Sequence, residues 1–153
     1  MSSYLREIAD ALATSLGEVS WMPASTTVER KNWASIDVEG MEDPVVYVVP
    51  GSADVSRIGR LTSQTDYEIN VFVGRRVTSD ADVDEMLDLA DDILRHIKAH
   101  EFDDLEEWPE GVTSPQAVTI DINPADALNE RNVWRAVIVA TYRIAEFDEL
   151  QQE

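Results

Sequence analysis

A long stretch of alternating apolar residues near the C-terminus constrains the fold of this chain more than any other feature. It spans Trp134–Ala145, and every second side chain in it is apolar: Trp134, Ala136, Ile138, Ala140, Tyr142 and Ile144. A two-residue period places these side chains on one face of a β-strand. Val137 and Val139 make the opposite face apolar as well, so we expect an internal strand whose middle is covered on both sides.

Further segments have the composition of strands. Val45–Val49 is a β-branched run, closed by Pro50-Gly51, of the kind that is buried on both faces of a sheet. In residues 66–76 the apolar positions alternate, which predicts a strand with one face in the core. That face holds Tyr67, Ile69, Val71 and Val73, and the other holds Glu68, Asn70 and Phe72. Residues 117–122 and about 54–62 complete the predicted sheet, and residues 26–30 are a candidate short strand.

Two segments have a helical period instead. The first predicted helix covers residues 3–16, with Ser3 as its N-cap and Gly17 as its stop. The second covers residues 81–99, capped by Ser79 or Asp80, and carries an apolar stripe formed by Val83, Met86, Leu87, Ala90, Ile93, Leu94 and Ile97. Strands and helices that occur in separate runs indicate an α+β fold. We therefore predict a single domain over residues 1–153, a mostly antiparallel sheet of about five strands with two packed helices.

The charge balance excludes several classes of function. The chain has 31 acidic and 12 basic residues, for a net charge of −19. Such a surface opposes non-specific binding to nucleic acid and to anionic membranes, which both need cationic groups. The longest apolar runs are far shorter than the roughly 20 residues that cross a bilayer, and the N-terminus lacks the pattern of a signal peptide. We therefore expect synthesis in the cytoplasm and no membrane partner.

No motif supports catalysis or a cofactor. The chain has no cysteine, no Gly-x-Ser-x-Gly elbow and no phosphate-binding glycine loop. Asp80-x-Asp82-x-Asp84 resembles the start of a calcium loop, but the sixth and twelfth positions lack the required glycine and glutamate. Carboxylates that complement the dipole of a helix N-terminus explain these residues better. We predict no catalytic residue, no cofactor and no metal site, and hence no enzyme.

Two histidines are the best alternative to that prediction. His96 and His100 are four residues apart and can share a helix face, but the metalloprotease pattern needs glutamate where Ile97 stands. Exposed histidines near a helix C-terminus, where positive charge is favoured, are the simpler interpretation. An enzyme that uses the two histidines remains a third hypothesis.

The distribution of charge points to interactions between proteins. Residues 80–110 contain thirteen acidic and two basic residues, which fits a solvated face, a surface that repels DNA or attracts a basic partner, or adaptation to high salt. Ten of the twelve basic residues are arginine, which forms bidentate pairs with carboxylates. The candidate interface arginines are Arg57, Arg60, Arg75, Arg76, Arg131 and Arg135. They pair either with carboxylates of a neighbouring copy or in ordinary surface salt bridges.

Several stretches together resemble the tail terminator and tail-completion proteins of long-tailed bacteriophages and related viruses. They are Asp43–Pro50 (DPVVYVVP), Tyr67–Val73 (YEINVFV), the helix at residues 82–97 and the run IDINPADALNERNVWRAVIVATYR from Ile120 to Arg143. The resemblance covers about residues 5–145. It implies a small subunit of a homo-oligomeric ring, often sixfold, at the head-proximal end of the tail tube in the neck of the virion. Such proteins have no catalytic residues.

The resemblance also implies partners. The ring ends polymerisation of the major tail tube protein and presents a docking surface to the head-completion or connector protein, while DNA passes through without specific binding. The polar loop at residues 123–132, with Asp126, Glu130 and Arg131, is the candidate contact with the tube or the lumen, and a plain surface hairpin loop is the alternative interpretation. The alternative is an acidic cytoplasmic adaptor that mimics DNA or binds a basic protein.

Overall fold

The chain folds into one five-stranded sheet with two helices. The computed structural model describes residues 4–32, 42–99, 115, 117–122 and 133–147. In chain order the elements are helix α1 (Tyr4–Gly17), strand β1 (Thr27–Arg30), strand β2 (Val45–Arg57), strand β3 (Thr62–Arg76), helix α2 (Asp80–Ala99), strand β4 (Ala117–Ile122) and strand β5 (Val133–Phe147). The strand order is β1-β2-β3-β5-β4. Only β1 and β2 are parallel, which confirms the predicted α+β class and mostly antiparallel sheet.

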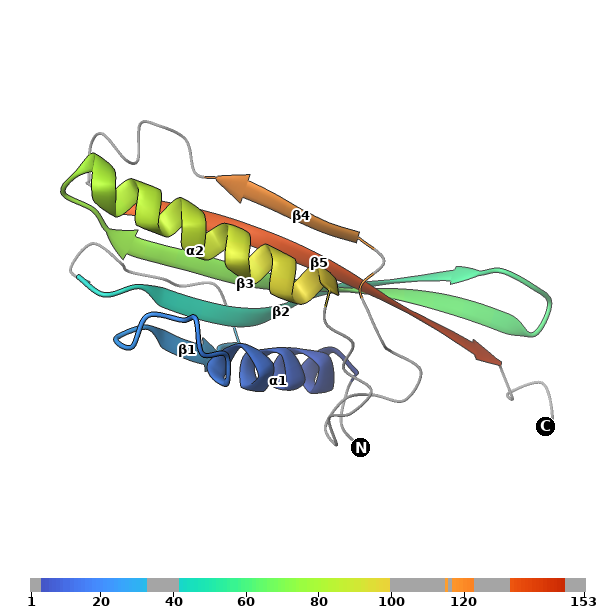
Figure 1. Ribbon diagram of the computed structural model, residues 1–153. Helices are drawn as coiled ribbons and strands as arrows, with labels where there is room; N and C mark the ends of the chain where they lie inside the picture. The colour runs from blue at the N-terminus through green and yellow to red at the C-terminus, as the bar shows by residue number, and fades with distance from the viewer. Residues whose placement is uncertain (1–3, 33–41, 100–114, 116, 123–132, 148–153) are drawn as a thin grey trace.

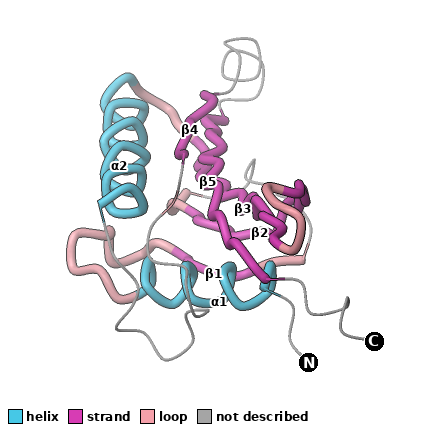
Figure 2. The backbone as a smooth tube through the Cα atoms, turned by 90° about the vertical axis from the view of Figure 1, so that its right-hand side faces the viewer, coloured by secondary structure: helices cyan, strands magenta, loops and turns pink. Residues whose placement is uncertain are grey.

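Both helices pack on the same face of the sheet (Figures 1 and 2). Helix α1 contacts β1 and β2, and helix α2 contacts β4 and β5. In Figure 2 the sheet bends, so that α1 lies beneath β1 while α2 stands beside β4 and β5. The core between them takes every second residue of the three long strands, as the alternation predicts. Its sheet residues include Val46, Val48, Ile69, Val71, Val73, Ala136, Ile138, Ala140 and Tyr142.

The helices bury most of the residues that were predicted to face the core. Ile8, Leu12 and Leu16 of α1 are fully buried at four-residue spacing. The buried residues of α2 are Met86, Leu89, Ala90, Ile93 and Ile97, so the prediction missed Leu89, while the predicted Val83 and Leu94 are only half-buried. The prediction that Leu87 belongs to the buried stripe is wrong, because Leu87 is 38% exposed. Each helical residue turns about 100° from the last, so Met86 and Leu87 cannot both face the sheet squarely.

The second face of the sheet carries a smaller apolar cluster. It contains Val45, Tyr47, Val49 and Val133, with Phe72 packed against them. All five residues of Val45–Val49 are buried, which confirms that this run is covered on both faces. Strand β5 lies between β3 and β4, as expected for an internal strand, but Val137 and Val139 on its second face are only half-buried.

Strand β2 differs from the prediction. Residues 45–49 and 54–62 were expected to be separate strands, but residues 45–57 form one strand and the turn to β3 occupies residues 58–61. The pairing with β3 shifts between Pro50 and Ala53, since Pro50 lies opposite Ile69 while Ala53 lies opposite Tyr67. An advance of three residues along β2 therefore corresponds to an advance of two residues along β3. This extra residue on β2 is a β-bulge. A bulge tolerates proline, so Pro50-Gly51 bends the strand instead of ending it.

Candidate functional site

Strands β2, β3 and β5 continue past both helices as a narrow extension (Figure 1). We call this extension, which comprises residues 53–67 and 142–147, the arm. Pairing within it runs without interruption from Ala53↔Tyr67 to Arg57↔Ser63, and β5 pairs with β3 along the same length. Every residue from Gly51 to Arg60 is exposed. Tyr142 and Ile144 at the base of the arm belong to the core, whereas the strand segment from Gly51 to Arg60 contributes no buried side chain.

The arm combines apolar and cationic side chains. Val55 is 70% exposed and Ile58 is 55% exposed. Arg57 and Arg60 lie beside them, and the Arg57 guanidinium Nη1 donates a hydrogen bond to the Arg60 carbonyl at 3.0 Å. The turn between β2 and β3 is closed by the main-chain N–H groups of Ile58 and Gly59, which donate to the Thr62 carbonyl at 3.1 and 3.2 Å. The tip therefore has a defined shape as well as an exposed apolar surface.

An ion pair braces the base of the arm. Arg143 of β5 lies directly opposite Asp66 of β3, and its Nε and Nη2 donate to the two carboxylate oxygens at 2.8 and 3.2 Å. The hydrogen bond from Arg143 holds the pKa of the Asp66 carboxyl below its ordinary value. A bidentate pair fixes orientation more than a single contact does, so it helps to hold β5 and β3 in register at the base of the arm.

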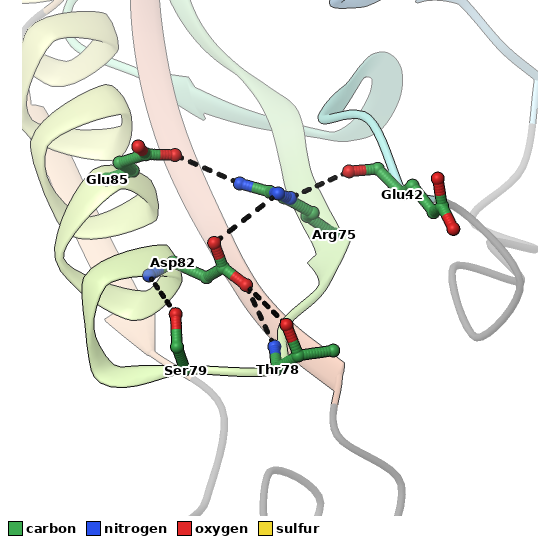
Figure 3. Close-up of polar contacts among 6 residues, drawn as sticks. All are labelled: Glu42, Arg75, Thr78, Ser79, Asp82 and Glu85. Atoms are coloured by element: carbon green, nitrogen blue, oxygen red, sulfur yellow. Dashed lines mark hydrogen bonds and ion pairs between the residues drawn. The ribbon is translucent and has the colours of Figure 1, made fainter.

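The other end of β3 carries a polar network around Arg75 (Figure 3). The Arg75 guanidinium donates from Nε to the Glu42 carbonyl at 2.8 Å, while Nη1 and Nη2 lie 3.1 and 3.5 Å from carboxylate oxygens of Glu85 and Asp82. The three nitrogens thus connect the chain before β2, the end of β3 and the first turns of α2. A cleft lined by Glu42, Arg75, Arg76, Thr78 and Asp82 lies beside this network.

The first turn of α2 explains why the network forms there. Ser79, one of the two predicted caps, is the N-cap, and its hydroxyl accepts a hydrogen bond from the Asp82 main-chain N–H at 3.2 Å. The Asp82 carboxylate in turn accepts from the main-chain N–H and the hydroxyl of Thr78, at 2.9 and 3.0 Å. The spacing Ser-x-x-Asp resembles a capping box. This spacing is the sequence signal from which the role of Asp82 in the first turn of α2 could have been predicted.

Asp82→Asn tests this network through the pH dependence of stability. The pKa of the Asp82 carboxyl lies below its ordinary value of 3.8, first because the Thr78 main-chain N–H donates to it, then because of the Thr78 hydroxyl and the Arg75 charge. The unfolded chain holds this proton more tightly, so the stabilisation is present above about pH 4 and is lost as the pH falls through the folded-state pKa. We expect the stability gap between wild type and Asp82→Asn to be widest near neutral pH and to narrow in acid.

Urea unfolding at a series of pH values measures that gap. Asp88→Asn is the matched control for the loss of one negative charge, because Asp88 is exposed on the same helix. A gap for Asp82→Asn that is independent of pH would show that the charge of the carboxylate does not stabilise the fold.

The predicted interface arginines that the structure describes do not form one patch. Arg57 and Arg60 lie at the tip of the arm, whereas Arg75 and Arg76 lie at the far end of β3. At about 3.3 Å per residue the two pairs are roughly 40 Å apart. Arg75 is engaged within its own chain, while Arg76 is exposed beside it. Arg135 lies on β5 opposite Gly74.

Histidine 96 has a different place from the one predicted. It was expected to be exposed, but it is half-buried between the helices, where its Nε2 lies 2.8 Å from the Ser15 hydroxyl of α1. The Trp21 ring packs edge-on against the imidazole, with centroids 6.1 Å apart. His96 therefore links α1 and α2.

Some predicted positions lie outside the described residues. These are Ser3, His100, Asp126, Glu130 and Arg131. The prediction that the loop at residues 123–132 contacts the tube or the lumen thus stays a prediction. Among the residues that the structure describes, no three His, Cys, Asp or Glu side chains are placed to hold a metal ion. Neither described helix combines the length and the apolar character needed to cross a membrane.

The chain shares its fold with solved structures, although sequence comparisons find no relative. No protein-family model matches the chain, and no curated protein matches it either. Among solved structures, the chain is similar to a chain in the "Virion of native gene transfer agent (GTA) particle", with a TM-score of 0.53 and 12% sequence identity. The match covers 95% of this chain and 100% of that one. At this identity the likeness demonstrates a shared fold along nearly the whole length of both chains.

Proposed function

We propose that this protein is a structural virion component that forms a homo-oligomeric ring at the head-proximal end of a tail tube. The observation that carries the proposal is the fold shared over 95% of the chain with a chain of a gene transfer agent virion. The tail-terminator-like stretches, residues 43–50, 67–73 and 120–143, support the same role from the sequence.

In this role the protein performs no chemistry and needs no cofactor. The ring ends tube polymerisation and joins the tail to the connector of the head, so its partners are further copies of itself, the tube protein and the connector protein. DNA passes through the ring without being held. A net charge of −19 suits a conduit, because each cationic contact with a phosphate would add to the affinity for the moving DNA.

Deletion of the gene tests the proposal. Without the ring, tube growth has no stop and the tail has no joint to the head, so we expect tails of irregular length and heads without tails. Electron microscopy of particles measures both, and expression of the wild-type chain in trans should restore them. Cryo-electron microscopy of wild-type particles should then place a ring of this chain at the neck.

The acidic adaptor remains the second candidate, favoured by one observation. The solvent side of α2 carries exposed carboxylates, including Asp80, Asp84, Asp88 and Asp92, which could attract a basic protein. If the deletion leaves particles normal, and the chain is recovered from cells on a basic protein instead of in virions, the adaptor replaces the ring.

A further inference from the structure

The tip of the arm has the composition of a docking element. Val55 and Ile58 are the two most exposed large apolar side chains in the described part of the chain, at 70% and 55%. Arg57 and Arg60 flank them on the same hairpin, and both are exposed. An apolar centre with an arginine border is the usual anatomy of a protein contact, since arginine and apolar residues are enriched there.

The complementary pattern lies on the outer face of α2. Leu87 is 38% exposed on this helix. Asp84 lies one turn before it and Asp91 one turn after it, and Asp88 is its direct neighbour. Residues three and four apart are neighbours on a helix surface, so the exposed leucine lies among carboxylates. Asp91 is paired with Arg95 at 3.0 Å, which leaves Asp84 and Asp88 as the exposed carboxylates beside Leu87. A single exposed leucine beside exposed carboxylates complements an apolar tip with a cationic border.

A single subunit cannot bring these two surfaces together. Strand β3 runs from the tip of the arm at Thr62 to Arg76, which is about 45 Å in an extended strand, and α2 begins four residues later. The tip and the first half of α2 therefore lie at opposite ends of the molecule (Figure 1). The ladder of β3 with β5 and the Asp66–Arg143 pair keep the arm from folding back.

We propose that the tip of the arm, Val55 to Arg60, docks on the outer face of α2, around Leu87, of a second copy of this chain. Two different surfaces of one chain then meet, which is a heterologous contact, and contacts of this kind close into rings when the rotation between subunits permits. The inference rests on the proposed ring, and it names the surfaces by which neighbouring subunits bind.

Disulfide trapping tests the contact directly, because the natural chain has no cysteine. The single variants Ile58→Cys and Leu87→Cys are mixed at high concentration under mild oxidation. The matched control replaces Leu87→Cys by Ile122→Cys, which places a thiol at another exposed apolar position, on β4. We expect cross-linked dimers to form at least about tenfold faster with Leu87→Cys, because a disulfide requires Cα atoms within about 7 Å. Equal rates with both partners, or faster pairing of Ile58→Cys with itself, would overturn the proposal.

Charge reversal gives an independent test. One variant carries Arg57→Glu and Arg60→Glu, and the other carries Asp84→Lys and Asp88→Lys. In the first variant an acidic arm meets an acidic helix, and in the second a basic arm meets a basic helix. We therefore expect the self-association of each variant to be at least about tenfold weaker than that of the wild-type chain at low salt. In an equimolar mixture every arm meets a helix of opposite charge, so association should return. Light scattering measures this, with thermal unfolding as the check that both variants fold.

The outcomes separate this inference from the proposed function. If a ring of the chain is present in particles but the trapping and the mixture both fail, the neighbouring subunits meet by other surfaces and only the inference falls. If particles contain no ring but the tip still binds α2 of a second copy, the contact is real and the proposed place in the virion is wrong.

Discussion

Replacing Ile138 with alanine should lower the free energy of unfolding by about 3–4 kcal/mol. Ile138 is fully buried at the middle of β5, opposite Val71 of β3 and Ile120 of β4. The substitution removes buried methyl groups and leaves a cavity where the two neighbouring strands and α2 meet. Because domains of this size are stable by only about 5–15 kcal/mol, the loss is a large part of the total.

Thermal and urea unfolding measure this effect. A loss of that size should lower the Tm by roughly 10 °C. Ile122→Ala is the matched control, since the same side chain is 50% exposed on β4, and its cost should stay below about 1 kcal/mol. Similar losses for the two variants would mean that the burial of the Ile138 side chain is not what stabilises the fold.

Gly51→Ala should also destabilise the fold, by about 1–3 kcal/mol, although alanine usually costs nothing in an exposed segment. A Cβ atom at position 51 would lie 2.7 Å from the Glu68 main-chain oxygen and 3.1 Å from the Asn70 side-chain nitrogen. The oxygen belongs to the backbone of β3, which cannot yield without disturbing its ladder with β5. The β-bulge at the base of the arm therefore requires glycine at position 51.

Gly59→Ala is the control for Gly51→Ala. At Gly59 the nearest atoms to an added Cβ, those of Thr62, lie 3.8 and 4.0 Å away, so alanine fits. We expect this variant to be neutral or slightly more stable, because alanine restricts the unfolded chain. Urea unfolding compares the two, and hydrogen exchange should show faster exchange in the arm for Gly51→Ala alone. Equal stability of both variants would contradict the close approach at the bulge.

The local pattern of the sequence was sufficient for both helices, for strands β3, β4 and β5 and for most of the buried faces. The second helix was predicted at residues 81–99 and observed at Asp80–Ala99, with Ser79 as its cap. The alternation in β3 and β5 identified the core side of each strand, from Ile69 to Tyr142. These features follow from side-chain geometry within one segment, which needs no knowledge of the partner segment.

Where prediction failed, a distant segment decided the outcome. The apolar period alone placed Leu87 in the core, although the stripe centred on Met86 and Leu89 sets how α2 sits on the sheet. Pro50 and Gly51 are typical of a turn, but the pairing of β2 with β3 continues on both sides of them and turns this break into a bulge. The contact of His96 with Ser15 could not be predicted from the local sequence either, because the two residues are 81 positions apart in the chain.

The sequence by itself thus determined the α+β class, the two helices, the buried faces of the long strands and the exclusion of a cysteine-based site. Only the tertiary structure decided that β5 lies between β3 and β4, that β1 runs parallel to β2, and that the arm projects past both helices. The physical reason is the range of the interactions. Periodicity reports which side of a segment avoids water, whereas the order of strands depends on hydrogen bonds and packing between segments that are far apart in the chain.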